Sequence, residues 1–243
     1  MELMKSISDN SIDLILTDSP YIISKESGYV NNSPDRKDYI SKYGKHKIDF
    51  GEWDKTELNI QNILSEFYRV LKPSGTLIMF YDFWKMQELR ECAEYIGFKQ
   101  PRLGIWNKTN PVPINSKLNY LSNSREFFAT FVKKSKPTFN SSYDDGNYYV
   151  SEKDDNYYLP ILHGKERTSH PTQKPISLIE DLVKKHSNDY DIILDPFMGS
   201  GTTGVACTNL SRKFIGIELN VMYYEIAKNR IEDNIGSDKS DLS

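Results

Sequence analysis

Residues 192–206 read IILDPFMGSGTTGVA, and this stretch decides the fold. An apolar run rich in β-branched side chains ends at Asp195, a glycine-rich turn follows, and apolar residues then recur with helical spacing. The pattern predicts a strand, a tight loop and a helix. Glycines let a ligand approach the backbone closely, and the free N–H groups at a helix start carry partial positive charge.

The glycines also fit the dinucleotide-binding fingerprint G-x-G-x-x-G, which is a weak signal when it stands alone. Gly199, Gly201 and Gly204 have this spacing, and a second apolar run from Phe214 ends at Glu218, close to the offset of a ribose-binding acid. The unit therefore predicts an adenosine-containing cofactor without saying which one. Only 25 residues follow Glu218, so the rest of the sheet and the substrate chemistry are expected upstream.

Composition is ordinary for a globular chain of 243 residues, with 38% hydrophobic and 27% charged residues, and predicts one large α/β domain or one with an insertion. No apolar run approaches the roughly 20 residues that span a bilayer, and the N-terminus has no signal-peptide pattern. Cys92 and Cys207 both lie in helical patterns, which argues against a disulfide framework and a zinc site. We expect a cytoplasmic protein with no membrane partner and no metal.

Net charge is −3, but the charges are distributed unevenly. Residues 99–136 hold eight lysines and arginines against one acid, Glu126, and residues 24–47 hold six bases against three acids. Such an asymmetry is typical either of a solvated face or of a surface that binds a polyanion.

Strands alternate with helices along the chain, which predicts an α/β fold with a doubly wound, mostly parallel sheet. The expected strands cover residues 11–18, 76–81, 103–107, 127–133, 192–195 and 214–218. Besides the helix after the glycine turn, the expected helices cover residues 56–72 (ended by Pro73, Ser74 and Gly75), 83–96, 175–185 and 221–235. Four segments follow from this pattern: 1–133 with a long mobile loop at 22–52, a small insertion outside the sheet at 134–169, a cofactor-binding half at 170–235, and a tail at 236–243.

A second candidate site lies where the first strand ends, at Asp18, Ser19, Pro20 and Tyr21. Proline cannot continue a central strand, so a rigid turn is expected there. An acid, two backbone carbonyls and an aromatic face can hold a planar ring that bears an amino group. The alternative is an ordinary turn with a surface tyrosine.

Here the chain resembles a known family, the β group of amino DNA methyltransferases. Asp18 to Tyr21 resembles the (D/N/S)-P-P-(Y/F/W) motif of that family, although Ser19 stands where the family usually has proline. Residues 195–202 (DPFMGSGT) are similar to its S-adenosylmethionine motif, and residues 170–175 (HPTQKP) to the segment just before it. The order of motifs is that of the β group, and lesser matches lie at 51–54, 69–75 and 106–108.

The resemblance implies a Rossmann-like class I methyltransferase fold with a small target-recognition insertion, and S-adenosyl-L-methionine as cofactor. Asp18 would accept a hydrogen bond from the target amine, the Ser19 and Pro20 carbonyls would help, and Tyr21 would stack on a flipped base. The implied cofactor-binding residues are Asp195, Phe197, Gly199, Gly201, Thr202, Glu218, Thr172 and Lys174. Asp195 would lie near the cofactor's amino group, Glu218 would hold the ribose, and Thr172 and Lys174 would close over the cofactor. For His170, a structural role bonded to the backbone is the competing interpretation.

The implied reaction moves a methyl group from the cofactor to the exocyclic amine of a base in double-stranded DNA. An acid at the first motif position favours adenine N6, and cytosine N4 is the alternative. Carbon-5 methylation needs a thiolate at the site, and neither cysteine lies at a strand end. We expect DNA phosphates at the basic segment 99–136 and the loop 22–52, and target reading at 134–169.

Two other classes of protein stay open at this point. A nicotinamide-dependent oxidoreductase could use the same glycine loop, and an inactive DNA-binding homologue could carry Ser19 in the altered motif. A cognate restriction endonuclease that shares the site, without forming a complex, is a further expectation. The sequence leaves monomer and homodimer undecided.

Overall fold

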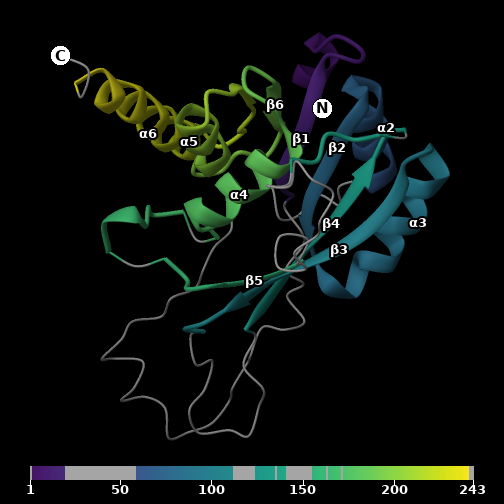
Figure 1. The fold of residues 1–243 in the computed structure, drawn as a ribbon, viewed down its shortest axis with the longest axis horizontal. Coiled ribbons are helices and arrows are strands. Elements are labelled where there is room, and N and C mark those ends of the chain that lie inside the picture. The colour runs from purple at the N-terminus through teal and green to yellow at the C-terminus, as the bar shows by residue number, and fades with distance from the viewer. Residues whose placement is uncertain are drawn as a thin grey trace, which may run out of the picture. The chain divides into compact units, whose positions relative to one another are not determined.

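A computed structural model describes residues 2–19, 59–111, 124–134, 136–140, 155–162, 164–170 and 172–240 (Figure 1). Pro20, Tyr21 and the expected loop at 22–52 lie outside these residues, as do residues 141–154. Short 3-10 helices cover Glu2–Ser6 (η1), Phe83–Lys85 (η5) and Gly164–Glu166 (η7).

Seven strands of the described chain form one sheet in the order β5-β3-β4-β2-β1-β6-β7. Their bounds are Ile12–Asp18 (β1), Leu71–Tyr81 (β2), Lys99–Lys108 (β3), Arg125–Val132 (β4), Asn156–Leu159 (β5), Ile192–Asp195 (β6) and Lys213–Gly216 (β7). Strands β2, β1, β6 and β7 pair in parallel, β4 runs antiparallel to β2 and β3, and β5 is parallel to β3. The predicted doubly wound, mostly parallel sheet is confirmed.

Helices cover both faces of this sheet (Figure 1). They are Ile60–Val70 (α2), Met86–Ile96 (α3), Ile176–His186 (α4), Thr202–Asn209 (α5) and Val221–Ser240 (α6). Alternate residues of a strand point to opposite faces. Thus Leu77 of β2 joins the core under α2 and α3, whereas Ile78 joins the core under α4 and α5.

Three predicted boundaries differ from the structure. Strand β2 begins at Leu71, directly after α2, and includes Pro73 to Gly75. Ile12 of β1 pairs with Leu71 and Leu14 pairs with Thr76, so the residues between Leu71 and Thr76 form a bulge in β2. Strand β7 ends at Gly216, two residues before Glu218. Helix α6 runs on to Ser240, past the expected end at 235, so the prediction that a frayed tail begins at 236 is wrong for residues 236–240.

The fourth difference concerns the predicted insertion at 134–169. Residues 156–159 form the edge strand β5, which pairs with β3 from Ile105 to Lys108, so the expectation that this segment stays outside the sheet is wrong here. The indole N–H of Trp106 also donates to the carbonyl of Leu159 at 2.9 Å. Both contacts join residues about fifty positions apart, which local patterning does not reveal.

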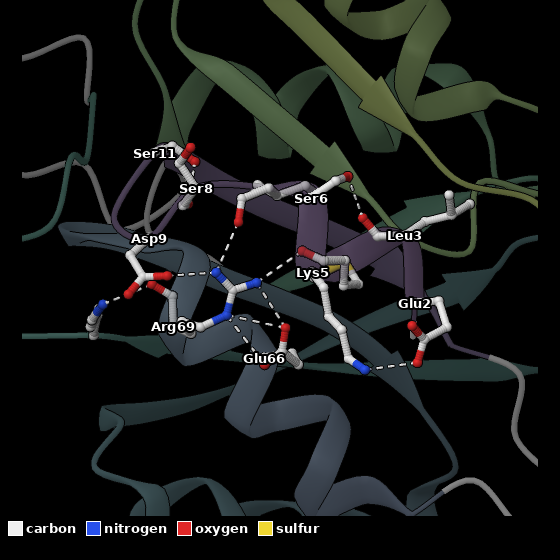
Figure 2. Close-up of polar contacts among 12 residues, drawn as sticks. Glu2, Leu3, Lys5, Ser6, Ser8, Asp9, Ser11, Glu66 and Arg69 are labelled. Atoms are coloured by element: carbon white, nitrogen blue, oxygen red, sulfur yellow. Dashed lines mark hydrogen bonds and ion pairs between the residues drawn. The ribbon is translucent and has the colours of Figure 1, made fainter.

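The segment that precedes β1 is anchored to α2 through Arg69 (Figure 2). Its guanidinium donates to the carbonyls of Met4 (2.9 Å) and Ile7 (2.8 Å) and pairs with Asp9 (2.6 Å) and Glu66 (2.8 Å). One planar cation thus satisfies two backbone acceptors and two carboxylates. In the part of the chain that is described, no helix combines the length and apolarity that crossing a membrane requires.

Replacing Arg69 with methionine is expected to lower the free energy of unfolding by roughly 2 kcal/mol, because two carbonyls and two acids lose their charged donor. Arg90→Met is the matched control, since Arg90 makes only an exposed pair with Glu94 at 3.2 Å and is expected to cost less than about 0.5 kcal/mol. Urea unfolding of both variants measures the difference. Equal losses would contradict the anchoring role of Arg69.

Candidate active site

The two strands that carry the candidate motifs are neighbours. Strand β1 pairs in parallel with β6, with Leu14 opposite Ile193 and Ile15 opposite Leu194, so both carboxyl ends lie at one edge of the sheet. From this pair the chain continues to β2 on one side and to β7 on the other. Such a reversal of strand order is where doubly wound folds bind ligands.

Asp195 ties the two strand ends together. Its Oδ1 accepts from the Thr17 hydroxyl at 2.7 Å and from the Phe197 N–H at 3.2 Å, and its Oδ2 accepts from the Thr203 hydroxyl at 2.7 Å. The pKa of Asp195 is raised to about 6, because burial disfavours the ionised form more than the hydrogen bonds from the two hydroxyls favour it. Both oxygens therefore already have protein partners, and the carboxylate fixes the glycine loop against β1.

The glycine loop has the backbone that the sequence predicts. Gly199 and Gly201 have φ angles of +49° and +77°, a region that other residues rarely adopt, and α5 begins directly after Gly201. A Cβ on Gly201 would lie 2.8 Å from the Cβ of Ala227. The loop thus depends on glycine both for its turn and for its packing against α6.

Glu218 lies beside this loop, as expected from its position after the second strand. Its Oε2 accepts from the Gly199 N–H at 3.0 Å, and its Oε1 accepts from the Asn220 N–H at 2.8 Å. A carboxylate offers about four acceptor sites, so each oxygen keeps capacity for a hydroxyl group of a ligand. The arrangement fits a sugar bound across the loop.

Arg230 of α6 is a site neighbour that the sequence does not reveal. Its Nη1 donates to the Ser200 carbonyl at 2.5 Å and to the Thr202 hydroxyl at 3.4 Å. Burial lowers the pKa of this guanidinium below its ordinary value. Arg230 belongs to no motif, so the sequence offers only its position in the last helix as a reason to expect it near the loop.

Asp18 lies at the end of β1, where its carboxylate is mostly enclosed. Its Oδ2 accepts a hydrogen bond from Lys174, whereas its Oδ1 is buried and has no partner among the described residues. Burial raises the pKa of Asp18, the positive charge of Lys174 opposes this, and the net pKa lies above its ordinary value. Ser19 is buried directly after it. Pro20 and Tyr21, which complete the motif, lie outside the described residues.

Lys174 was expected to close over a cofactor, and the structure places it against Asp18 instead of the glycine loop. Only 5% of its side chain is exposed. Its Nζ also pairs with Glu126 at 3.0 Å, and Glu126 pairs with Lys108 at 2.7 Å. Glu126 and Lys108 are thus site residues missed from sequence, although Glu126 is the single acid of the basic segment and Lys108 belongs to a lesser motif match.

The segment before α4 contacts the glycine loop through His170. The ring packs edge-on against Tyr223, with centroids 4.6 Å apart, and a Cβ on Gly199 would lie 2.8 Å from its Nε2. Burial, together with the charges of Lys174 and Arg230, lowers the pKa of His170 to about 4, so the ring is neutral at pH 7. Thr172 offers its carbonyl to Lys174 at 3.5 Å.

The basic segment 99–136 does not form one surface. Lys133 is buried and donates to Asn10 and to the Leu71 carbonyl, and Lys108 is held by Glu126. Lys99 pairs with Val132, in the row of Leu14, so the exposed Lys99, Lys134 and Lys136 lie roughly 13 Å or more along the strands from the row of Asp18. Of the exposed bases that the structure describes in this segment, Arg125 lies at the Asp18 edge.

Comparisons with known proteins agree with this arrangement. A protein family described as DNA methylase matches residues 12–229. The chain is 32% identical to the Type II methyltransferase M2.MboI of Moraxella bovis, over 96% of this chain and 85% of that protein. It is also 32% identical to M.HinfI of Haemophilus influenzae, over 96% of this chain and 66% of that protein.

Solved structures show the same fold. The complex of M1.HpyAVI with SAM has a TM-score of 0.68 at 29% identity and covers 95% of this chain and 94% of its own. The cytosine-N4-specific PvuII DNA methyltransferase has a TM-score of 0.67 at 17% identity, over 97% and 88% of the two chains. The expected Rossmann-like methyltransferase fold is confirmed. Among the described residues, no three acidic, histidine or cysteine side chains gather in a way that could hold a metal ion.

Replacing Gly201 with alanine is expected to destabilise the protein more than Gly164→Ala does. Both glycines have positive φ, so both variants carry backbone strain of about 1 kcal/mol. At Gly164 a Cβ meets nothing within 4 Å, whereas at Gly201 it clashes with Ala227, which adds about 1–3 kcal/mol. Urea unfolding gives both values, and equal losses would argue against tight packing of the loop on α6.

Proposed function

The chain belongs to the DNA methylase family, and we propose that it is a site-specific methyltransferase that uses S-adenosylmethionine to methylate adenine N6 in double-stranded DNA. The observation that carries the proposal is the buried, unpartnered oxygen of Asp18 on the strand next to the glycine loop. Family membership argues against the nicotinamide-dependent alternative, in which Asp18 has no evident role. Cytosine N4 is the second candidate base, because the same acceptor can serve either exocyclic amine.

Asp18 supplies the acceptor that an exocyclic amine needs. Its free Oδ1 would take one N–H of the target amine, while its Oδ2 stays with Lys174. A hydrogen bond of this kind orients the nitrogen lone pair and stabilises the positive charge that develops on nitrogen. We propose that the carbonyls of Ser19 and Pro20 take the other N–H and that Tyr21 stacks on a base turned out of the duplex.

The residues around the glycine loop fit the cofactor. Glu218 has acceptor capacity for the ribose hydroxyls, and the backbone of Gly199 and Gly201 can be approached closely because neither carries a Cβ. When bound, S-adenosylmethionine supplies an activated methyl group. We propose contacts from Phe197, Thr202 and Thr172 as the family resemblance implies, with Asp195 holding the loop in place, whereas Lys174 stays on Asp18.

The setting of this activity is also a proposal. The relatives are Type II methyltransferases, so we propose that a cytoplasmic restriction endonuclease reads the same short site while acting as a separate protein. The segment 134–169 is the proposed target-recognition region. Because its residues 156–159 complete the sheet, base reading is assigned to the part of the segment outside β5.

Replacing Asp18 with alanine is expected to reduce methyl transfer by about 100-fold or more while S-adenosylmethionine still binds. The loss follows because the acceptor for the amine disappears while Glu218 and the glycine loop are untouched. Transfer of tritium from labelled cofactor to unmethylated DNA measures the activity, and calorimetry measures cofactor binding. Asp233→Ala, at an exposed position of α6, is the control. Full activity of the Asp18 variant would remove the assigned role.

Replacing Arg125 with glutamine is expected to weaken DNA binding about 3- to 10-fold at low salt and to flatten the salt dependence, because one phosphate contact is lost. Lys99→Gln is the control: it removes an exposed base from the same segment, at the first residue of β3 and in the row of Leu14, away from the edge where Arg125 lies. Fluorescence anisotropy with a labelled duplex at several salt concentrations compares them. Equal weakening by the two variants would contradict a DNA surface at the Asp18 edge.

A further inference from the structure

Four charged side chains form an alternating row across the sheet edge. Asp18 pairs with Lys174, Lys174 pairs with Glu126 at 3.0 Å, and Glu126 pairs with Lys108 at 2.7 Å. They come from β1, the segment before α4, β4 and β3, so the row joins parts of the chain up to 156 residues apart. The proposed contacts to amine and cofactor give no role to Glu126 or Lys108.

Geometry shows how the row orients Lys174. The ammonium group lies 5.0 Å from the centre of the Phe80 ring and is held on one side by Glu126, which leaves it facing one oxygen of Asp18. Lys108, itself 5.3 Å from the ring centre of Trp106, holds the other oxygen of Glu126. Without Glu126 or Lys108 in place, Lys174 could bind both oxygens of Asp18 or move away from Asp18.

Each charged residue of the row raises or lowers the pKa of its neighbours. Burial raises the pKa of Glu126, but Lys174 and Lys108 outweigh burial, so the net pKa lies below its ordinary value and Glu126 stays ionised. Toward Asp18, the charge of Lys174 lowers the pKa, that of Glu126 raises it, and that of Lys108 lowers it again. Asp195, on the neighbouring strand, is the other acid that interacts with Asp18.

We propose that Glu126 and Lys108 are positioning residues for methyl transfer: together they hold Lys174 on one oxygen of Asp18, which keeps the other oxygen free for the amine. The inference rests on the proposed function, since the free oxygen matters only if an amine binds there. Neither residue needs to touch base or cofactor.

The two single variants should move the pH profile in opposite directions. Glu126→Gln removes a negative charge, which lowers the pKa of Asp18, so the acid limb of kcat should shift down by about 1 pH unit. Lys108→Gln removes a positive charge, which raises that pKa, so the limb should shift up by a similar amount. In the double variant the acid limb should lie close to that of the wild type, because one negative and one positive charge are removed together.

Both single variants should also lose rate on the pH plateau, about 10-fold in kcat, with unchanged KM for the cofactor and for DNA. A purely structural role would lower the amount of active protein at every pH and would not move the limb. Acid unfolding of a destabilised variant can move the limb only to higher pH, so partial unfolding cannot imitate the downward shift of Glu126→Gln.

Titration of the Asp18 carboxyl by NMR, with carbon-13 at the aspartate side chains, tests the same shifts without methyl transfer. Opposite shifts in both measurements support the proposal. Suppose the wild type methylates DNA, but the acid limbs and the Asp18 titration curves are the same in all variants or shift in one direction. The positioning role is then wrong, while the proposed function stands. If the wild type transfers no methyl group to DNA, the proposed function fails and the positioning role with it, whatever the titration shows.

Discussion

The hydrogen bond from Thr17 to Asp195 holds the two halves of the candidate site together. Parallel pairing of β1 with β6 brings their ends to one edge, but pairing alone leaves the loop after β6 free to move. The carboxylate of Asp195 removes that freedom, because its oxygens bind β1, the loop and the start of α5 at once. A buried carboxylate without these donors would be costly, so loop and strand stabilise each other.

On this frame the chain separates two tasks. The side of β6 and β7 carries glycine backbone and Glu218, whose chemistry suits hydroxyl groups of a ligand. The side of β1 and β4 carries Asp18 and Glu126, two acids enclosed with two lysines. Because opposite charges alternate along that row, an ionised acid can persist at an enclosed position with one oxygen unpaired. That unpaired oxygen is a hydrogen-bond acceptor that a ligand can use.

Local patterns in the sequence predict much of the fold. The apolar run before Asp18 and the glycine turn after Asp195 both depend on neighbours within a few residues, and the structure has them as expected. The edge strand β5 does not show in the sequence as part of the sheet because its four residues pair with β3, about fifty positions away. From the sequence alone Pro73 to Gly75 predict a helix end, because the bulge that they form depends on pairing with the distant strand β1.

Site residues divide in the same way. Asp18 and Gly199 are visible because they belong to motifs, whereas Glu126 and Arg230 act through contacts made by distant elements. Net charge along residues 99–136 is visible in the sequence, but the strands carry its bases to opposite ends of the sheet. Charge in a segment therefore indicates a binding surface only once the register of its strands is known.

Long-read sequencing of DNA from cells that express the chain tests most directly whether the two strand ends form one methyl-transfer site. The arrangement of Asp18 beside the glycine loop predicts N6-methyladenine at one short, recurrent sequence, and none in cells that express the Asp18→Ala variant. Unmodified DNA in cells with the wild-type chain, or methylation that survives the loss of Asp18, would contradict it.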